Sequence, residues 1–197
     1  MSDRTIDPLP RIGPHIVLRR LRTTDLERFQ AYRSDPEVGR FQGWGPMSSN
    51  AAASFLERMS AAAFGTVGEW FQLGIAERTT DHLIGDVGVC IRDSDGKHAE
   101  LGYTLAVEWQ GRGLGSEAVL EAIAMLFENT DITRVIAITD TRNHASLRLL
   151  ERIGMKLTGS LNSVFRGAPC NEHVFAIVRP NGSSGNAKTS ISGKSNR

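Results

Sequence analysis

Hydrophobic and polar positions change their period along the chain, and the middle of the sequence has the character of β-structure. Strand-forming residues dominate positions 70–76, 83–91 and 99–107, and turn residues separate these runs. Such a composition is typical of strands. The sequence Asp-Ser-Asp-Gly at residues 93–96 predicts a hairpin turn between the second and third of them. We therefore predict an antiparallel meander of three strands.

Apolar residues recur at a helical spacing in four further stretches. The predicted helices cover residues 26–33, 50–64, 116–129 and 143–153. Thr23 or Thr24 is the expected cap of the first helix, and Ser48 or Ser49 is that of the second. In the third helix one apolar stripe should face the core, and it consists of Val119, Leu120, Ile123, Leu126 and Phe127.

Other strand signals lie on both sides of the meander. Residues 15–22 predict a first strand, residues 134–139 a strand after the third helix, and residues 156–165 and 172–179 two more. The strand over 99–107, the helix after it and the next strand form a βαβ unit, so these two strands should be parallel. The sequence thus predicts a mixed sheet with helices, in the α/β (α+β) class.

Length and composition set the number of domains. With 197 residues, of which 40% are hydrophobic, the chain can bury one core of ordinary size. We expect a single domain over residues 15–180, preceded by an N-terminal extension over residues 1–14. Residues 181–197 have almost nothing to bury and predict a disordered tail.

Charge and cysteine content narrow the class of partner. The 23 basic and 22 acidic side chains give a formal net charge of +1, which argues against nucleic-acid and membrane partners. Cys90 and Cys170 lie far apart and lack the spacing of metal ligands, so no metal is expected. No apolar leader or long apolar run is present. These features indicate a reduced, cytoplasmic protein.

A glycine-rich segment joins the third meander strand to the helix over 116–129. It reads Gln-Gly-Arg-Gly-Leu-Gly at residues 110–115. Glycine adopts positive φ angles and lets a ligand approach the backbone closely. The start of the helix adds unpaired amides and a partial positive charge. The segment therefore predicts a site for a phosphate or pyrophosphate, with a simple chain reversal as the alternative.

Two other phosphate-binding motifs do not fit this segment. A nucleotide-triphosphate loop ends in Gly-Lys-Ser/Thr, whereas Gly115 is followed directly by Ser116. A dinucleotide fold requires Gly-x-Gly-x-x-Gly after the first strand and an acidic residue about 20 positions later. The glycines here follow a later strand and have a different spacing.

With these elements in order, the chain resembles the GNAT acetyltransferases, and among them the RimJ/RimL type. The similarity covers residues 16–179, while residues 40–68 match less well and leave the acceptor undetermined. Met155 stands where the family commonly has Phe. The shared motifs are Leu-Arg-Arg-Leu from residue 18, Ser-Asp-Pro-Glu-Val from 34, Leu-Ile-Gly-Asp-Val-Gly from 83, Glu-Leu-Gly-Tyr from 100, Trp-Gln-Gly-Arg-Gly-Leu-Gly-Ser-Glu-Ala from 109, and Asn-His-Ala-Ser-Leu-Arg-Leu-Leu-Glu-Arg-Ile-Gly-Met from 143.

The resemblance implies a GNAT fold, in which a mixed, mostly antiparallel sheet flanked by helices is splayed between its fourth and fifth strands. Acetyl-CoA would bind in that splay, with its pyrophosphate on the glycine loop and its pantetheine beside the preceding strand. The residues implied in this binding are Leu105, Ala106, Val107, Gln110, Gly111, Arg112, Gly113, Leu114, Gly115, Ser116 and Asn143.

Candidate catalytic residues follow from the same resemblance. Ser146 lies where RimL-type enzymes have a hydroxyl near the departing thiolate, but Ser146 and Asn143 are equally suited to cap their helix. Glu100, on the strand leading to the splay, is the first candidate for the general base, with a surface ion pair as the alternative role. Weaker candidates for the base are Glu69, Asp86 and Glu172. The two tyrosines, neither of which matches the family's tyrosine acid, are Tyr32 and Tyr103.

The expected function is transfer of an acetyl group from acetyl-CoA to a primary amine in a ternary complex. A terminal α-amine has a pKa of about 7.7–8.0, against about 10.4 for lysine, and is therefore the easier nucleophile. A protein or peptide N-terminus is thus the leading acceptor. The alternatives are a polyamine or an aminoglycoside, or a CoA-binding module without turnover. A homodimer is compatible with this class.

Overall fold

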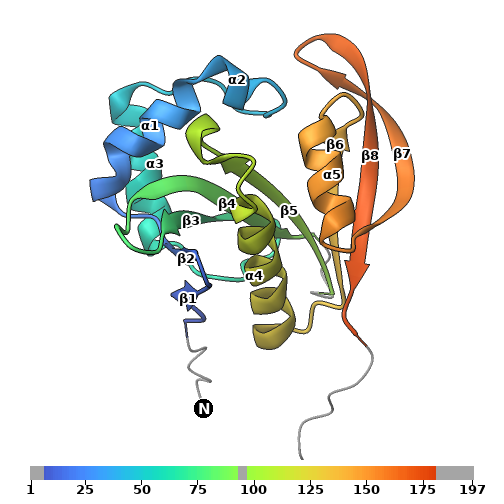
Figure 1. Ribbon diagram of the computed structural model, residues 1–197, viewed down its shortest axis with the longest axis horizontal. Helices are drawn as coiled ribbons and strands as arrows, with labels where there is room; N and C mark the ends of the chain where they lie inside the picture. Colours follow the sequence, from blue (N-terminus) through green and yellow to red (C-terminus); the bar gives the residue numbers. More distant parts are fainter. Residues whose placement is uncertain (1–6, 93–96, 181–197) are drawn as a thin grey trace, which may run out of the picture.

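One sheet of eight strands runs through the computed structural model of the protein, which describes residues 7–92 and 97–180 (Figure 1). The strands follow one another across the sheet in the order β1-β2-β3-β4-β5-β6-β8-β7. Their bounds are Arg11–Ile12 (β1), Ile16–Arg20 (β2), Trp70–Glu77 (β3), Leu83–Ile91 (β4), His98–Leu105 (β5), Arg134–Asp140 (β6), Lys156–Phe165 (β7) and Ala168–Val178 (β8). The helices are Leu26–Ser34 (α1), Pro36–Gly39 (α2), Ser49–Ala61 (α3), Leu114–Asn129 (α4) and His144–Arg152 (α5), with 3-10 turns at Thr23–Asp25 (η1) and Val107–Trp109 (η2).

The predicted meander and βαβ unit are confirmed. Strands β3, β4 and β5 pair antiparallel, and β5 pairs parallel with β6 across the helix α4. Strand β1, which is two residues long, was not predicted. It lies in the expected N-terminal extension and pairs with β2. The predicted hairpin turn at 93–96 and tail at 181–197 lie outside the described residues.

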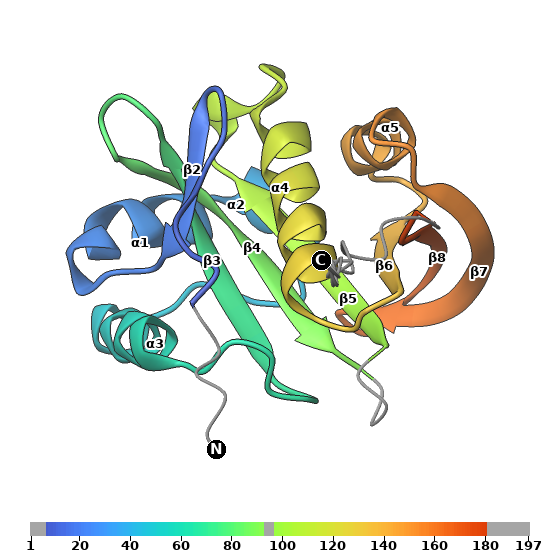
Figure 2. The same cartoon turned by 90° about the horizontal axis from the view of Figure 1, so that it is seen from below.

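Helices cover both faces of the sheet. Figure 2 shows α4 on one side of β3 and β4, and α1 and α3 on the other. Each side has its own cluster of buried apolar residues, one built on α4 and one on α1 and α3. Within the described residues, no helix is long and apolar enough to cross a membrane.

Three residues of the predicted stripe on α4, Val119, Ile123 and Leu126, are buried as predicted, but the buried face extends further to one side. Ala118, Ala122 and Met125 are fully buried, whereas Leu120, which the stripe included, is 45% exposed. Leu120 lies on the opposite side of the helix from these residues, since each residue advances the helix by about 100°. The predicted stripe therefore covered only part of the buried face, which also includes two alanines and Met125.

The two cap predictions have different outcomes. Ser48 caps α3, because its hydroxyl accepts a hydrogen bond from the Ala51 amide at 3.3 Å, as predicted. The threonine cap of α1 is wrong, because Thr23 and Thr24 lie within η1. The Asp25 carboxylate instead accepts from the Arg22 amide at 2.8 Å.

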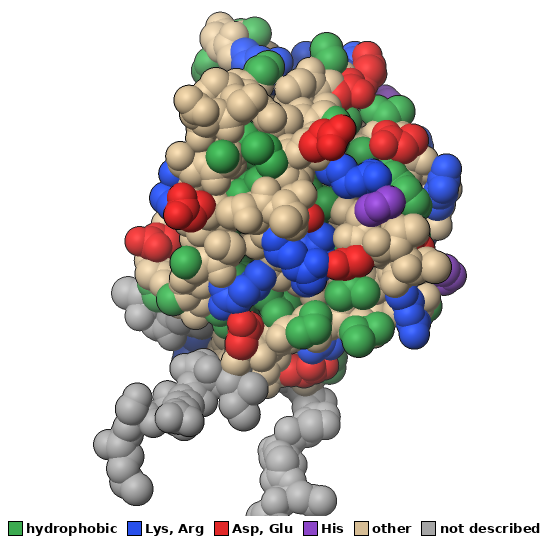
Figure 3. Space-filling model, turned by 90° about the vertical axis from the view of Figure 1, so that its left-hand side faces the viewer, with side chains coloured by type: hydrophobic (Ala, Val, Ile, Leu, Met, Phe, Trp, Pro, Cys, Tyr) green, Lys and Arg blue, Asp and Glu red, His purple; other side chains and the backbone are tan. Residues whose placement is uncertain are grey.

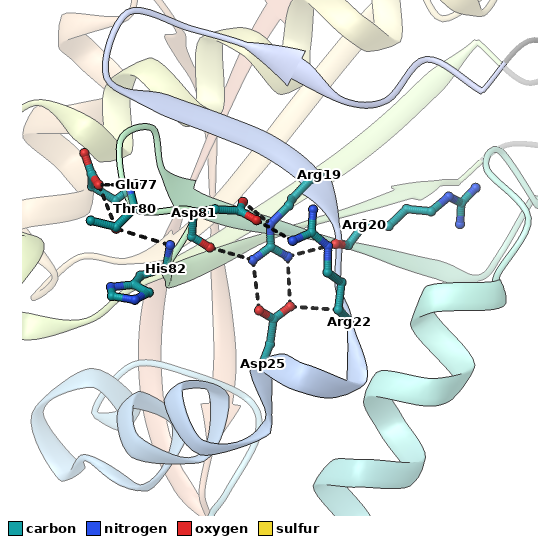
Figure 4. A network of polar contacts seen from close by, with 8 residues as sticks. All are labelled: Arg19, Arg20, Arg22, Asp25, Glu77, Thr80, Asp81 and His82. Atoms are coloured by element: carbon teal, nitrogen blue, oxygen red, sulfur yellow. Dashed lines mark hydrogen bonds and ion pairs between the residues drawn. The ribbon is translucent and has the colours of Figure 1, made fainter.

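A buried ion pair explains why Asp25 has this role. Arg19 of β2 donates from Nη1 and Nη2 to the two Asp25 oxygens at 2.8 and 2.9 Å, and from Nε to Asp81 at 2.8 Å (Figure 4). Arg22 also pairs with Asp81. Burial opposes the charge on Arg19, but its bonds to Asp25 and Asp81 outweigh that effect and raise its pKa. The network joins β2 to the start of α1 and to the turn between β3 and β4.

The outer surface agrees with the low net charge. On the face seen in Figure 3, basic and acidic side chains are interspersed and do not gather into a patch of one sign. Such a face offers no extended attraction to a polyanion.

Candidate active site

The sheet opens between β5 and β6. These two strands pair only between His98–Glu100 and Arg134–Ile136, so the second half of β5 has a free edge toward β6. On that edge the Tyr103 and Leu105 carbonyls accept hydrogen bonds from the side-chain amides of Gln42 at 3.2 Å and Gln110 at 2.8 Å. The splay expected between the fourth and fifth strands is therefore present. Because the short β1 adds one strand at the start of the chain, these two strands are numbered β5 and β6.

The glycine loop leads directly into α4. Gly111 has φ of 72° and Gly113 has φ of 83°, a left-handed conformation that favours glycine. Gly113 is the cap residue of α4, and a Cβ on it would meet no atom within 4 Å. Its φ angle therefore explains the glycine here, and open space lies in front of it.

One polar atom at the start of α4 has no partner. The Ser116 hydroxyl is buried and has no hydrogen bond within the described residues. Burying a polar group without a partner is unfavourable, so such an atom beside a cleft indicates a ligand. The loop amides, the helix start and this hydroxyl together suit a phosphate oxygen.

A cleft of about 380 Å³ runs from this loop along the open edge of β5. Seven of the residues expected to bind the cofactor line it, namely Leu105, Gln110, Gly111, Gly113, Gly115, Ser116 and Asn143. Three arginines that sequence reasoning missed also line it, namely Arg40, Arg148 and Arg152. The last two are four residues apart on α5, a spacing that places them on one face and could have revealed them.

Four other expected cofactor residues are not among those that line the cleft. Ala106 and Leu114 are buried in the two apolar clusters. Val107 is 46% exposed and lies in η2, because β5 ends at Leu105 and not at residue 107. The Arg112 guanidinium lies over the Trp109 ring, 5.1 Å from its centroid. Their side chains therefore shape the loop or face outward.

Asn143 and Ser146 meet Tyr103 at the far end of the cleft. Asn143 caps α5, since its side-chain oxygen accepts from the Ser146 amide at 3.1 Å. The Ser146 hydroxyl is 2.8 Å from the Tyr103 hydroxyl, and both residues line the cleft. Burial raises the pKa of Tyr103 to about 12, although its bond to Ser146 has the opposite effect. Tyr103 thus places a neutral hydroxyl beside Ser146, although neither tyrosine matches the position of the family's tyrosine acid.

A second, smaller cavity lies beyond this tyrosine–serine pair. Its volume is about 100 Å³, and it shares Phe41, Gln42, Tyr103, Asn143 and Ser146 with the cleft. The residues that line it alone are Leu101, Gly102, Ala137, Ile138, Thr139, Asp140, Phe165 and Glu172. The two spaces therefore have the hydroxyl pair in common among their lining residues.

The carboxylates are placed differently from the expectation. Glu100 lines neither cavity, and its Oε2 lies 2.8 Å from Arg92 Nε and 2.7 Å from Nη2. Glu172, the weaker candidate, lines the smaller cavity, and its side chain has no hydrogen bond or ion pair within the described residues. Asp140 also lines that cavity, where two bonds from Arg142 lower its pKa. Glu172 therefore lines the same cavity as the Tyr103 and Ser146 hydroxyls, and no cation holds its carboxylate among the residues that the structure describes.

The other weak candidates have no place in the site. Asp86 is 2% exposed and is bound by the Tyr32 hydroxyl at 2.5 Å and by Arg33 at 2.8 Å. Glu69 is exposed before β3 and lines neither cavity. Among the residues that the structure describes, no group of three His, Cys, Asp or Glu side chains is arranged to hold a metal ion.

The comparison with known proteins agrees with this geometry. Residues 15–156 match the family model described as the acetyltransferase (GNAT) domain. The chain is 30% identical over 167 residues to the uncharacterized N-acetyltransferase YoaA of Bacillus subtilis, covering 84% of this chain and 94% of that protein.

Solved structures share the fold. A GNAT-family acetyltransferase from Bacillus anthracis has a TM-score of 0.77 and 19% identity, with 86% of this chain and 98% of that chain covered. The ribosomal-protein alpha-N-acetyltransferase RimL in complex with coenzyme A has a TM-score of 0.73 and 15% identity, with 85% and 96% covered. The chain belongs to the GNAT family of acetyl-CoA-dependent N-acetyltransferases.

Proposed function

We propose that the larger cleft binds acetyl-CoA with its pyrophosphate at the glycine loop. The backbone amides that follow Gly111 and Gly113, and the unpartnered Ser116 hydroxyl, are suited to hold phosphate oxygens. The arginines on α5, Arg148 and Arg152, add positive charge along the same cleft. These groups are the support for the donor site.

The rest of the donor would lie along the open edge of β5. Alternate residues of a strand present their backbone groups to one side, so this edge can bind an extended amide chain as another strand would. The chain would bind beside the side-chain amides of Gln42 and Gln110, which bond two carbonyls of the edge. The pantetheine of acetyl-CoA contains such amides. Its thioester would then reach the Tyr103 and Ser146 hydroxyls, where the cleft meets the smaller cavity.

The smaller cavity is the proposed site of the acceptor amine. Glu172 would take the proton that an ammonium group must lose before its nitrogen can attack the thioester carbonyl. When the carbon–sulfur bond breaks, Ser146 would supply a proton to the thiolate and regain one from Tyr103. The second proton that the attacking nitrogen loses as it becomes an amide would restore the tyrosine. The observation that carries this proposal is the meeting of the two cavities at the Tyr103–Ser146 pair.

An N-terminal α-amine is the acceptor that this cavity supports best. A polyamine or an aminoglycoside brings several positive charges, yet one of the two lining carboxylates is already paired with Arg142. Glu172 alone suits a single ammonium group. An α-amine is also easier to deprotonate than a lysine amine by about 2–3 pKa units. The relative RimL is described as an alpha-N-acetyltransferase, which agrees with this choice.

A thiol-release assay with acetyl-CoA tests the function. Short peptides with free N-termini should release CoA thiol, and the same peptides with blocked N-termini should not. Faster release with polyamines or aminoglycosides would reverse the choice of acceptor. Tight binding of acetyl-CoA without release by any amine would identify a CoA-binding module in place of an enzyme.

A further inference from the structure

An arginine occupies a turn position that favours other residues. Arg166 and Gly167 are the central residues of the turn between β7 and β8, where Phe165 pairs with Ala168. Their φ angles are 50° and 80°, and this geometry favours Asn-Gly over an arginine. A non-glycine residue held in the left-handed region has an energetic cost, so we expect its side chain to have a compensating role.

The Arg166 side chain reaches across the splay. Its Nη2 donates to the Gly39 carbonyl at 2.9 Å and, at longer distances of 3.4 and 3.5 Å, approaches the Trp44 and Gln42 carbonyls. In Figure 1, α2 and the turn between β7 and β8 lie at the same end of the molecule. Arg166 therefore joins the two halves of the sheet above the point where they separate.

The segment that Arg166 holds, residues 39–44, is here named the strap. Phe41 and Gln42 of the strap line both cavities, and Gln42 bonds the Tyr103 carbonyl on β5. Trp44 lies over the buried Arg33 guanidinium, 4.3 Å from it to the ring centroid. The strap is thus fixed to the β5 side by Gln42 and Trp44, and Arg166 fixes it to the β8 side.

We propose that Arg166 is a latch that closes the acceptor cavity and selects slender amines. With the latch closed, the cavity measures about 100 Å³, against about 380 Å³ for the cleft. Phe165, the residue before the latch, lines this cavity together with Phe41 of the strap. An acceptor that is bulky beside its amine can enter only if the bond to the Gly39 carbonyl breaks, and this penalty would lower its kcat/KM. The selection rests on the proposed transfer to an amine.

The variant Arg166→Asn isolates the latch. Asparagine suits the left-handed turn position, so the hairpin should form at least as well, while the contact across the splay is lost. Arg78→Asn is the matched control, because Arg78 also donates to backbone carbonyls, those of Gly13 and Pro14, and lines neither cavity. Both variants should keep the KM for acetyl-CoA.

Two measurements then decide the inference. Amide hydrogen exchange of residues 39–44 should accelerate in Arg166→Asn and not in Arg78→Asn; unchanged exchange would show that there is no latch.

The kcat/KM ratio of a tripeptide beginning with Trp to one beginning with Gly should rise by about tenfold or more in Arg166→Asn. Faster exchange with an unchanged ratio would exclude the role in selection. If the wild-type protein acetylates none of the peptides, the proposed acceptor is wrong and selection among peptides is excluded with it, while hydrogen exchange still tests the latch.

Discussion

The Tyr103 hydroxyl lies 2.8 Å from the Ser146 hydroxyl, across the opening between β5 and α5. Asn143 fixes the start of α5 and thereby the position of Ser146. Burial raises the pKa of Tyr103 to about 12, so this tyrosine keeps its proton at neutral pH. In the proposed reaction this pair would pass a proton to the departing thiolate, with Ser146 as the donor and Tyr103 as its source.

Removal of the tyrosine hydroxyl should slow turnover without affecting donor binding. For Tyr103→Phe we expect kcat to fall on the order of 100-fold, near the low end for loss of an acid catalyst, because Ser146 retains a hydroxyl. The KM for acetyl-CoA should change little. Steady-state thiol release measures both values. Tyr32→Phe is the control, since Tyr32 bonds Asp86 away from both cavities and should affect stability more than kcat. Full activity of Tyr103→Phe would limit that hydroxyl to a structural role.

The glycine loop can be tested with a single acidic residue. Gly113→Asp adds a side chain and a negative charge where the loop opens onto the cleft, so binding of acetyl-CoA should be lost in calorimetry. Gly68→Asp is the matched control, because Gly68 has a similar φ of 81° and equally open surroundings but does not line the cleft. Both variants introduce the same backbone strain. Equal affinities in the two variants would place the pyrophosphate elsewhere.

Local patterns were sufficient to predict most of the fold. Period and turn residues predicted the strands and helices to within a few residues, and the alternate glycines predicted the loop before α4. The errors occurred where tertiary packing decides. Leu120 is exposed because alanines, and not the larger side chains alone, define the buried face of α4.

The site was harder to predict, because its residues meet across the splay. Glu100 was preferred as the base, but at Glu100 strand β5 is still paired with β6, opposite Ile136. The opening begins after that residue, and Tyr103 is the first aromatic residue beyond it. Glu172 lies opposite Asp140, at the end of β6 that borders the opening. The register of three strands is needed to bring these groups together, and no local pattern contains it.

Two glutamate-to-glutamine variants therefore test which residue is the general base. Glu172→Gln should lower kcat/KM for a peptide acceptor on the order of 100-fold, since an amide cannot accept the ammonium proton. The loss should shrink as pH rises and more of the amine is already neutral. Glu100→Gln should have little effect on kcat, because Glu100 is held by Arg92 outside both cavities. The pH dependence of kcat/KM for the three proteins provides the comparison. A larger loss in Glu100→Gln would restore the original candidate.

The buried pair of Arg19 and Asp25 should dominate stability on the side of α1. Their side chains are 4% and 7% exposed, so Arg19→Met would leave the Asp25 carboxylate buried without its cation. Loss of one partner of a buried pair costs about 3–5 kcal/mol of unfolding free energy. Urea denaturation should show this loss, and adding Asp25→Asn should recover part of it by removing the uncompensated charge. Arg11→Met is the control, because its partners Glu121 and Glu128 are 27% and 58% exposed and pairs that water reaches contribute at most about 1 kcal/mol each. A comparable loss in both variants would mean that the network in Figure 4 contributes no more to the unfolding free energy than an exposed ion pair.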